Sequence, residues 1–183
     1  MTRKPACRGK VWVHFGDEAP EQPRRSHHQK KFMAYIFFSK TGPVYCDMDT
    51  SNKVNSDYYI KYYLNPMVTA RKSRHRKADI DRLVLHHDNA RPHTSKRTTG
   101  YIIATGFKVL RPPPYSPDLA PCDFWLFPLI KGRLAGQIFD SVEAVRDAWI
   151  GELNKHTHED FHACFSTWFE RAKQVVSNGG NYI

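Results

Sequence analysis

Residues 83–94 read Leu-Val-Leu-His-His-Asp-Asn-Ala-Arg-Pro-His-Thr, an apolar run that leads directly into an acidic residue. The run at 83–85 is short and fully apolar, which predicts a buried strand. Asp88 comes just after this strand. Because open α/β sheets bind their ligands at the carboxyl ends of strands, we expect Asp88 to lie in a functional site.

A second unusual stretch, residues 113–128, reads Pro-Pro-Tyr-Ser-Pro-Asp-Leu-Ala-Pro-Cys-Asp-Phe-Trp-Leu-Phe-Pro. It places Asp123 at the start of a helix, after a proline-rich turn. Between Asp88 and Asp123 lie 34 residues. Carboxylates gathered from distant segments are typical ligands of a hard divalent cation. Asp118, five residues before Asp123, is expected to stabilise the turn instead.

The composition predicts a single domain with a polyanionic partner. The chain has 183 residues, and its 28 Lys and Arg outnumber 18 Asp and Glu, giving a formal charge of +10. Nucleic acid is the commonest partner of so basic a chain, although a solvated basic surface is the alternative. The candidates for phosphate contact are Arg71, Lys72, Arg74, Arg76 and Lys77 in the densest cationic run, together with Arg91 and His93.

Other compositional features exclude several classes of protein. No apolar run approaches the roughly 18 residues of a membrane span, and the basic start lacks the apolar region of a signal peptide. We therefore expect no membrane partner. The cysteines are scattered and include no C-x-x-C pair, which argues against a zinc ribbon or a disulfide framework and fits a reducing compartment.

The order of the expected elements predicts an α/β fold. Residues 32–38 and 43–46 form a predicted hairpin, and a helix opened by Ser56 should end or kink near Asn65 because of Pro66. A helix at 94–105, a strand at 107–110, and helices opened by capping motifs at 140–143 and 157–160 follow. We expect a mixed sheet flanked by helices in residues 32–183, preceded by a basic segment at 1–31 with little regular structure.

These residues carry a resemblance to a known family. His87 to His93 and the string from Tyr115 to Pro121, followed by Asp123, resemble the second and third catalytic motifs of the mariner branch of the Tc1/mariner transposases. The spacing of Asp88 and Asp123 is similar to the mariner form of the acidic triad. Similarity extends from about Val11 to Tyr182, which is nearly the whole chain.

The resemblance implies an RNase H-like catalytic domain that cuts and transfers DNA with Mg²⁺ or Mn²⁺. It implies that Asp88 bridges the metal ions and that Asp123 holds one of them, with no small-molecule cofactor. Transposon-end DNA, a homodimer and the nucleus are the implied partners and compartment. General chemistry agrees, because two divalent ions can activate the attacking oxygen and stabilise the leaving oxygen of a phosphodiester. Asn89 and His93 either orient ligands or the substrate phosphate, or make turn hydrogen bonds.

The chain departs from the family at the first catalytic Asp, which lies in an Asp-Glu pair on the first, central strand. The one Asp-Glu pair here is Asp17-Glu18, and it stands closer to Asp88 than the family's spacing requires. We therefore expect that the first Asp and the central strand are missing, with substitution by Asp17 as the alternative. Two carboxylates alone should position two metal ions poorly. The expected protein is a truncated, inactive transposase catalytic domain, or a non-catalytic DNA-binding remnant.

One competing motif points to another class of enzyme. His158-Glu159-Asp-Phe-His162 matches H-E-x-x-H, in which two histidines on a helix share zinc and the Glu acts as general base. The motif needs a third ligand downstream, and only about twenty residues remain there. A zinc metalloprotease is therefore the remote alternative.

Overall fold

The computed structural model describes residues 32–50, 53–74 and 83–181, and predictions that fall on residues 1–31, 51–52, 75–82 and 182–183 lie outside it. The elements, in chain order, are β1 (Met33–Ser39), β2 (Gly42–Asp49), α1 (Ser56–Tyr59), a π-helical turn (Ile60–Leu64), α2 (Asn65–Arg74), β3 (Val84–His86), α4 (Arg91–Thr94), α5 (Lys96–Ala104), β4 (Lys108–Leu110), a 3-10 turn (Pro117–Leu119), a second π-helical turn (Cys122–Leu126), α6 (Phe127–Leu134), α7 (Val142–Leu153) and α8 (His158–Ser177). The expected α/β class is confirmed.

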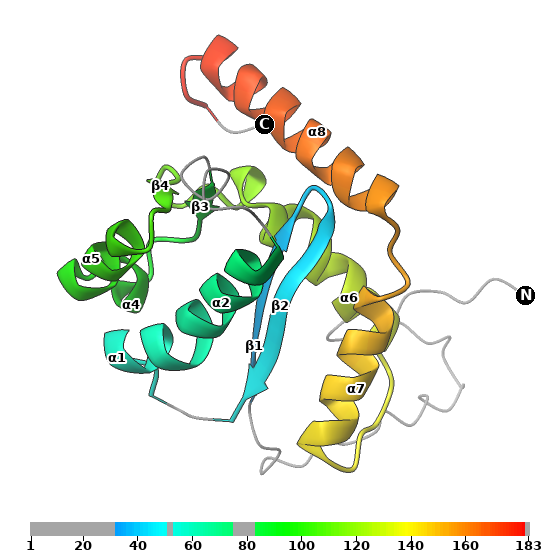
Figure 1. The fold of residues 1–183 in the computed structure, drawn as a ribbon. Helices are drawn as coiled ribbons and strands as arrows, with labels where there is room; N and C mark the ends of the chain where they lie inside the picture. The colour runs from blue at the N-terminus through cyan, green and yellow to red at the C-terminus, as the bar shows by residue number, and fades with distance from the viewer. Residues whose placement is uncertain (1–31, 51–52, 75–82, 182–183) are drawn as a thin grey trace, which may run out of the picture.

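The hairpin β1–β2 lies between two layers of helices (Figure 1). Its strands are antiparallel, and Gly42 closes the turn with a φ of +115°, a backbone conformation that favours glycine. A side chain at Gly42 would be strained there and would also point at Phe161, whose ring lies 3.9 Å from the position of a Cβ. The predicted hairpin is therefore confirmed, with its turn packed against α8.

Each face of the hairpin packs on its own apolar cluster. Tyr35 and Phe37 pack on the first cluster, whose buried members are Tyr59, Tyr63, Leu64, Met67, Val68, Leu85, Ile102 and Phe107. Ile36 and Phe38 pack on the second cluster, formed by Leu126, Ile130, Trp149, Leu153 and Phe161. Since successive side chains of a strand point to opposite faces, one strand connects both layers of helices.

The sheet differs from the single mixed sheet that the sequence predicted. Strands β3 and β4 form a parallel pair in the register Val84↔Lys108 to His86↔Leu110, and β1 and β2 form a separate antiparallel pair. No strand among the described residues joins the two pairs. This division agrees with the expectation that the central strand is missing.

The helix that begins near Ser56 does not end near Asn65, the first of the two outcomes predicted from Pro66, but it is irregular there. Asn55, rather than Ser56, caps it, and the chain stays helical to Arg74. The π-helical turn explains the difference, because the backbone N–H of Asn65 bonds to the carbonyl of Ile60 five residues earlier. This wider turn comes directly before Pro66, which lacks an N–H and would crowd the carbonyl of a regular α-helix.

The capping motif predicted at 157–160 is confirmed, whereas α7 is capped by Ser141 and not by Asp140, the first residue of the predicted motif. Ser141 caps α7, and Thr157 and Asp160 form a reciprocal capping box at the start of α8. None of the helices in the described ranges combines the length and apolar character that crossing a bilayer requires. Helix α8 runs across one end of the molecule (Figure 1).

The second apolar cluster should be sensitive to truncation of its side chains. Leu126 is fully buried, so Leu126→Ala is expected to lower the free energy of unfolding by roughly 2–5 kcal/mol. Chemical denaturation measures this change. The control is Ile103→Ala, at a side chain that is 66% exposed, and it should shift stability by less than about 0.5 kcal/mol. Equal effects of the two changes would contradict the assigned core.

Candidate metal centre

Asp88 lies two residues after the end of β3, and its carboxylate is held through one oxygen. Oδ1 accepts hydrogen bonds from the backbone N–H of Ala90 at 3.0 Å and from Nδ1 of His93 at 2.6 Å. The hydrogen bond from His93 is the main reason why the pKa of Asp88 falls to about 2. The side chain is nevertheless 67% exposed. Asp88 is therefore an ionised carboxylate that remains open to solvent.

Asp123 lies in the second π-helical turn, directly before α6. Its backbone N–H bonds to the carbonyl of Ala120 at 2.8 Å, so the turn that follows Pro117 fixes its position. Pro128 follows this π-helical turn just as Pro66 follows the first one. The wider turn again precedes a proline inside a helix, and here it carries a candidate ligand.

The two carboxylates are close enough to act on each other. Burial raises the pKa of Asp123, and the negative charge of Asp88 raises it further, while Lys131 lowers it. The charge of Asp88 also contributes to the raised pKa of the Cys122 thiol, although burial is the larger cause. The charge of Asp88 therefore acts on Asp123, although 34 residues lie between them in the chain.

Aromatic and imidazole rings surround Asp88 on the core side. Tyr59 is only 1% exposed, and its ring centroid lies 4.1 Å from that of His93. His87 lies 5.1 Å from His93, and burial lowers its pKa to about 4. The ring centroid of His86 lies 4.8 Å from that of Trp168 of α8.

The donor set fits a hard divalent cation. The two candidate ligands offer carboxylate oxygens, which Mg²⁺ and Mn²⁺ prefer. Neighbouring soft ligands are occupied or protonated, because His93 Nδ1 is bonded to Asp88 and burial raises the pKa of Cys122 to about 12. A cation between the carboxylates would relieve the repulsion that raises the pKa of Asp123.

The structure places some, but not all, of the other predicted site residues. Asn89 donates from Nδ2 to the carbonyl of Pro112 at 3.2 Å, a loop contact that ties the Asp88 segment to the proline-rich turn. Arg71, Lys72 and Arg74 lie in the last turn of α2, and Arg91 begins α4 with an exposed side chain. Arg76, Lys77 and Asp17 lie outside the described residues.

The zinc motif does not form a complete site within the described part of the chain. His158 and His162 face each other at 6.4 Å between ring centroids on the first turns of α8. However, no group of three His, Cys, Asp or Glu side chains that could hold a metal occurs among the described residues. Asp160, at a variable position within the motif, accepts the backbone N–H of Thr157 and so caps the helix.

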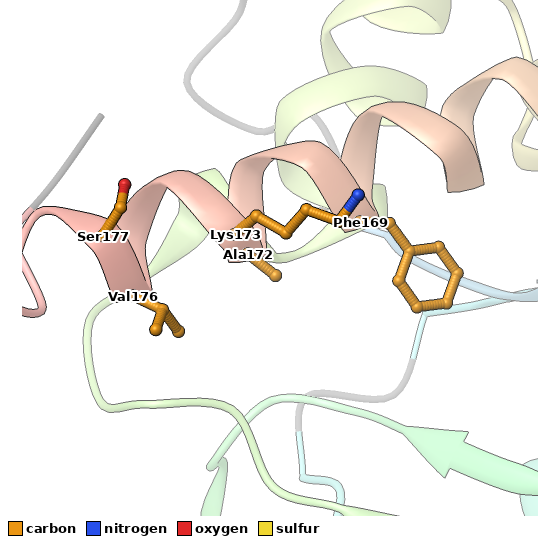
Figure 2. A pocket seen from close by; sticks show the side chains of 5 residues that line it. All are labelled: Phe169, Ala172, Lys173, Val176 and Ser177. Atoms are coloured by element: carbon orange, nitrogen blue, oxygen red, sulfur yellow. The ribbon is translucent and has the colours of Figure 1, made fainter.

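A hollow on α8 is separate from the carboxylates. Phe169, Ala172, Lys173, Val176 and Ser177 line it, and all five belong to that one helix (Figure 2). Phe169 and Val176 are 64% and 80% exposed. Its lining contains no acidic residue, so this apolar face is not the candidate metal centre.

Sequence reasoning missed the residues that surround the two acids. The sequence offered one indication that Asp88 pairs with His93, because His93 follows Asp88 by five positions across the start of a short helix. Lys131 had a weaker signal, because it follows Asp123 by eight residues in a helical segment. The sequence offered no indication of Tyr59, because its contact with His93 depends on how α1 packs against α4.

Comparisons with known proteins agree with this fold. A family model described as "Transposase (partial DDE domain)" matches residues 3–80. The mariner Mos1 transposase of Drosophila mauritiana is 29% identical over 179 residues, covering 96% of this chain and 52% of that protein. The human histone-lysine N-methyltransferase SETMAR is 29% identical over 172 residues, covering 91% of this chain and 25% of that protein.

Solved structures of Mos1 show the same architecture. A pre-cleavage Mos1 transpososome matches with a TM-score of 0.84 at 28% identity, covering 96% of this chain and 52% of that chain. A Mos1 paired-end complex with Mn matches with a TM-score of 0.82 at 26% identity. A Mos1 paired-end complex with Mg matches with a TM-score of 0.83 at 28% identity. Each match covers 96% of this chain and 52% of the Mos1 chain. Divalent metals therefore occur in the proteins that this chain is similar to.

The α/β fold and the converging carboxylates define an RNase H-like catalytic domain of the kind found in DNA transposases. Together with the matches to Mos1, they support the assignment of the chain as a Tc1/mariner transposase catalytic domain. The expected family and fold are thereby confirmed. The chain spans about half the length of Mos1 transposase and a quarter of the length of SETMAR.

Removing the charge of Asp123 should stabilise the metal-free fold. The folded-state pKa of Asp123 is raised above its ordinary value of 3.8, so its ionised form is penalised above that raised pKa. Asp123→Asn should therefore melt at a higher temperature than the wild type at pH 7 in chelator. This gain should shrink as the pH falls through the raised pKa and vanish below 3.8, where the wild-type carboxyl is also neutral.

Thermal melts at several pH values test this expectation. Asp147→Asn, at an exposed position on α7, is the matched control and should leave the melting temperature unchanged. A lower melting temperature of Asp123→Asn at pH 7 would show that Asp123 is not destabilised by Asp88.

Proposed function

We propose that this chain is a mariner-type transposase catalytic domain that binds transposon-end DNA and holds one Mg²⁺ or Mn²⁺ ion between Asp88 and Asp123. It does not complete DNA cleavage and strand transfer with the described residues alone. It acts in the nucleus, as a homodimer on paired DNA ends. Solved complexes of Mos1 contain paired transposon ends, and one contains Mn. The proposal extends these partners to the present chain.

The convergence of Asp88 and Asp123 carries the proposal. Their pKa values shift in opposite directions, Asp88 downward because of His93 and Asp123 upward because of burial and of Asp88. Neighbouring titratable groups with divergent pKa values are characteristic of functional sites. The site also lies just after a strand, where α/β folds bind their ligands.

The side chains of this site would divide the work around a phosphodiester. A divalent ion bound here would polarise a phosphate oxygen and favour ionisation of a water molecule. Asp88 stays ionised across the physiological range and supplies a permanent negative charge. Asp123 supplies a second oxygen ligand, and Lys131 adds a positive charge beside it. The basic side chains of α2, together with Arg91 of α4, would hold the DNA backbone.

The site falls short of a two-metal centre. Two metal ions need more acidic ligands than one pair of carboxylates, and no third acidic, His or Cys ligand joins them among the described residues. Asp17 is the remaining candidate in this chain, and a partner chain is another source. Without a third ligand, the chain retains DNA binding but not catalysis, which corresponds to the second function expected from the sequence.

A plasmid nicking assay tests the proposed lack of catalysis. With Mg²⁺ or Mn²⁺, the wild type should nick supercoiled DNA no faster than Asp88→Ala, because the described residues provide only two acidic ligands. Robust nicking that Asp88→Ala abolishes would refute inactivity. Asp17→Ala then identifies the source of the third ligand, since loss of nicking in that variant would assign the role to Asp17.

Salt dependence of DNA binding tests the proposed contact surface. Each phosphate contact contributes roughly 0.9 to the slope of log affinity against log salt concentration for duplex DNA. The triple change of Arg71, Lys72 and Arg74 to Ala should therefore flatten the slope by about 2–3 and weaken binding to all sequences similarly. Fluorescence anisotropy in chelator measures the slope.

The matched control removes the same charge elsewhere. Lys40, Arg146 and Lys173 are exposed in the hairpin turn, α7 and α8, and their change to Ala should alter the slope much less. Equal slopes for the two triple variants would mean that overall charge, rather than the end of α2, determines DNA binding. Thermal melts must confirm that both variants are folded, because Arg71 is half-buried.

A further inference from the structure

We propose that His93 is a positioning residue that fixes the orientation of Asp88 for cation binding, rather than a contact to DNA. The inference rests on the proposed metal-binding function of the Asp88 and Asp123 pair. Of the roles that the sequence left open for His93, it selects the orientation of a ligand over contact with a phosphate.

The two oxygens of Asp88 differ in their surroundings. Both hydrogen bonds to the carboxylate, from Ala90 and from His93, end on Oδ1. No hydrogen bond to Oδ2 occurs among the described residues, and the side chain is 67% exposed. Because an ionised carboxylate can only accept, Nδ1 of His93 must carry the hydrogen. His93 thus occupies one oxygen and leaves the other available.

The ring of His93 cannot readily turn toward solvent. Its side chain is 17% exposed. Its ring centroid lies 4.1 Å from that of Tyr59 and 5.1 Å from that of His87. Tyr59 belongs to the first apolar cluster, so the ring of His93 contacts the core of the protein. A phosphate would have little access to such a side chain, whereas Asp88 is in direct contact with it.

The backbone that carries His93 is anchored as well. The N–H of His93 bonds to the carbonyl of Ala90 at 2.8 Å. The hydroxyl of Thr98 donates to the carbonyl of Pro92 at 2.6 Å, and Thr98 is fully buried. Ser95 donates its hydroxyl to Thr98 and accepts the Thr98 N–H. Together these bonds fix the corner between α4 and α5 from which His93 reaches Asp88.

A held carboxylate loses less conformational freedom when it binds a cation, so its orienting partner raises metal affinity. Partners of this kind typically account for about 10–100-fold in affinity. The effect should depend on a hydrogen-bond donor at Nδ1 and not on the aromatic ring. Two substitutions separate these properties, because Asn places an amide N–H at the position of Nδ1, while Phe keeps a ring against Tyr59 and has no donor.

The test is Mn²⁺ binding to the whole chain, measured by the electron paramagnetic resonance of free Mn²⁺. His93→Phe should weaken binding by roughly 10–100-fold, and His93→Asn should remain within a few-fold of the wild type. His162→Phe, at an exposed position on α8, is the control and should bind like the wild type. DNA affinity in chelator should be the same for all of these variants, because His93 acts through Asp88.

The outcomes distinguish the inference from the function on which it rests. Mn²⁺ binding that disappears in Asp88→Asn but persists in a folded His93→Phe would overturn the role of His93 alone. Weak binding in both His93→Phe and His93→Asn would show that the ring, not the donor, is required, and would also overturn it. Failure of the wild type to bind Mn²⁺ would sink the proposed metal centre itself. If His93→Phe does not fold, His93→Leu serves as the variant without a donor.

Discussion

The alternation of side chains along β1 is the constraint on which the rest of the structure depends. Ala34, Ile36 and Phe38 face the cluster under α6 and α7, while Tyr35 and Phe37 face the cluster under α1 and α2. On β2, a shift in register opposite Phe37 and Phe38 lets the consecutive residues Val44 and Tyr45 both reach the first cluster. One hairpin therefore organises two layers of helices, although the described sheet is split.

The site is connected to this core through two further constraints. The ring of Tyr59 packs against that of His93, so the first apolar cluster extends to the partner of Asp88. Leu126 and Ile130 are fully buried in the second cluster, so the segment that begins with Asp123 is held by the opposite layer. The carboxylates therefore come from the two layers that the hairpin joins. A disturbance of either layer changes the distance between them.

The sequence predicted what is encoded locally and over short spacings. The hairpin, the glycine at its turn and the capping box of α8 were confirmed, because each depends on a few neighbouring residues. The continuation of the helix past Pro66 was missed, since it depends on a hydrogen bond between Asn65 and Ile60 that the periodicity does not reveal. The division of the sheet was expected only through the family resemblance. The contact of Tyr59 with His93, the partner of Asp88, could not be predicted, because packing between distant elements creates it.

The electrostatics of the pair show why an incomplete centre can still persist in a stable fold. Asp88 is stabilised by groups of its own segment, so its charge does not depend on a metal ion. Burial and the repulsion from Asp88 disfavour the ionised form of Asp123, and its exposed position and the nearby Lys131 limit that cost. The domain can therefore fold around two acids without a cation. Catalysis is more demanding, because a two-metal centre needs ligands on more than one side of each ion. Loss of the ligand supplied by a central strand would thus remove activity before it removed the fold or the basic surface that binds DNA.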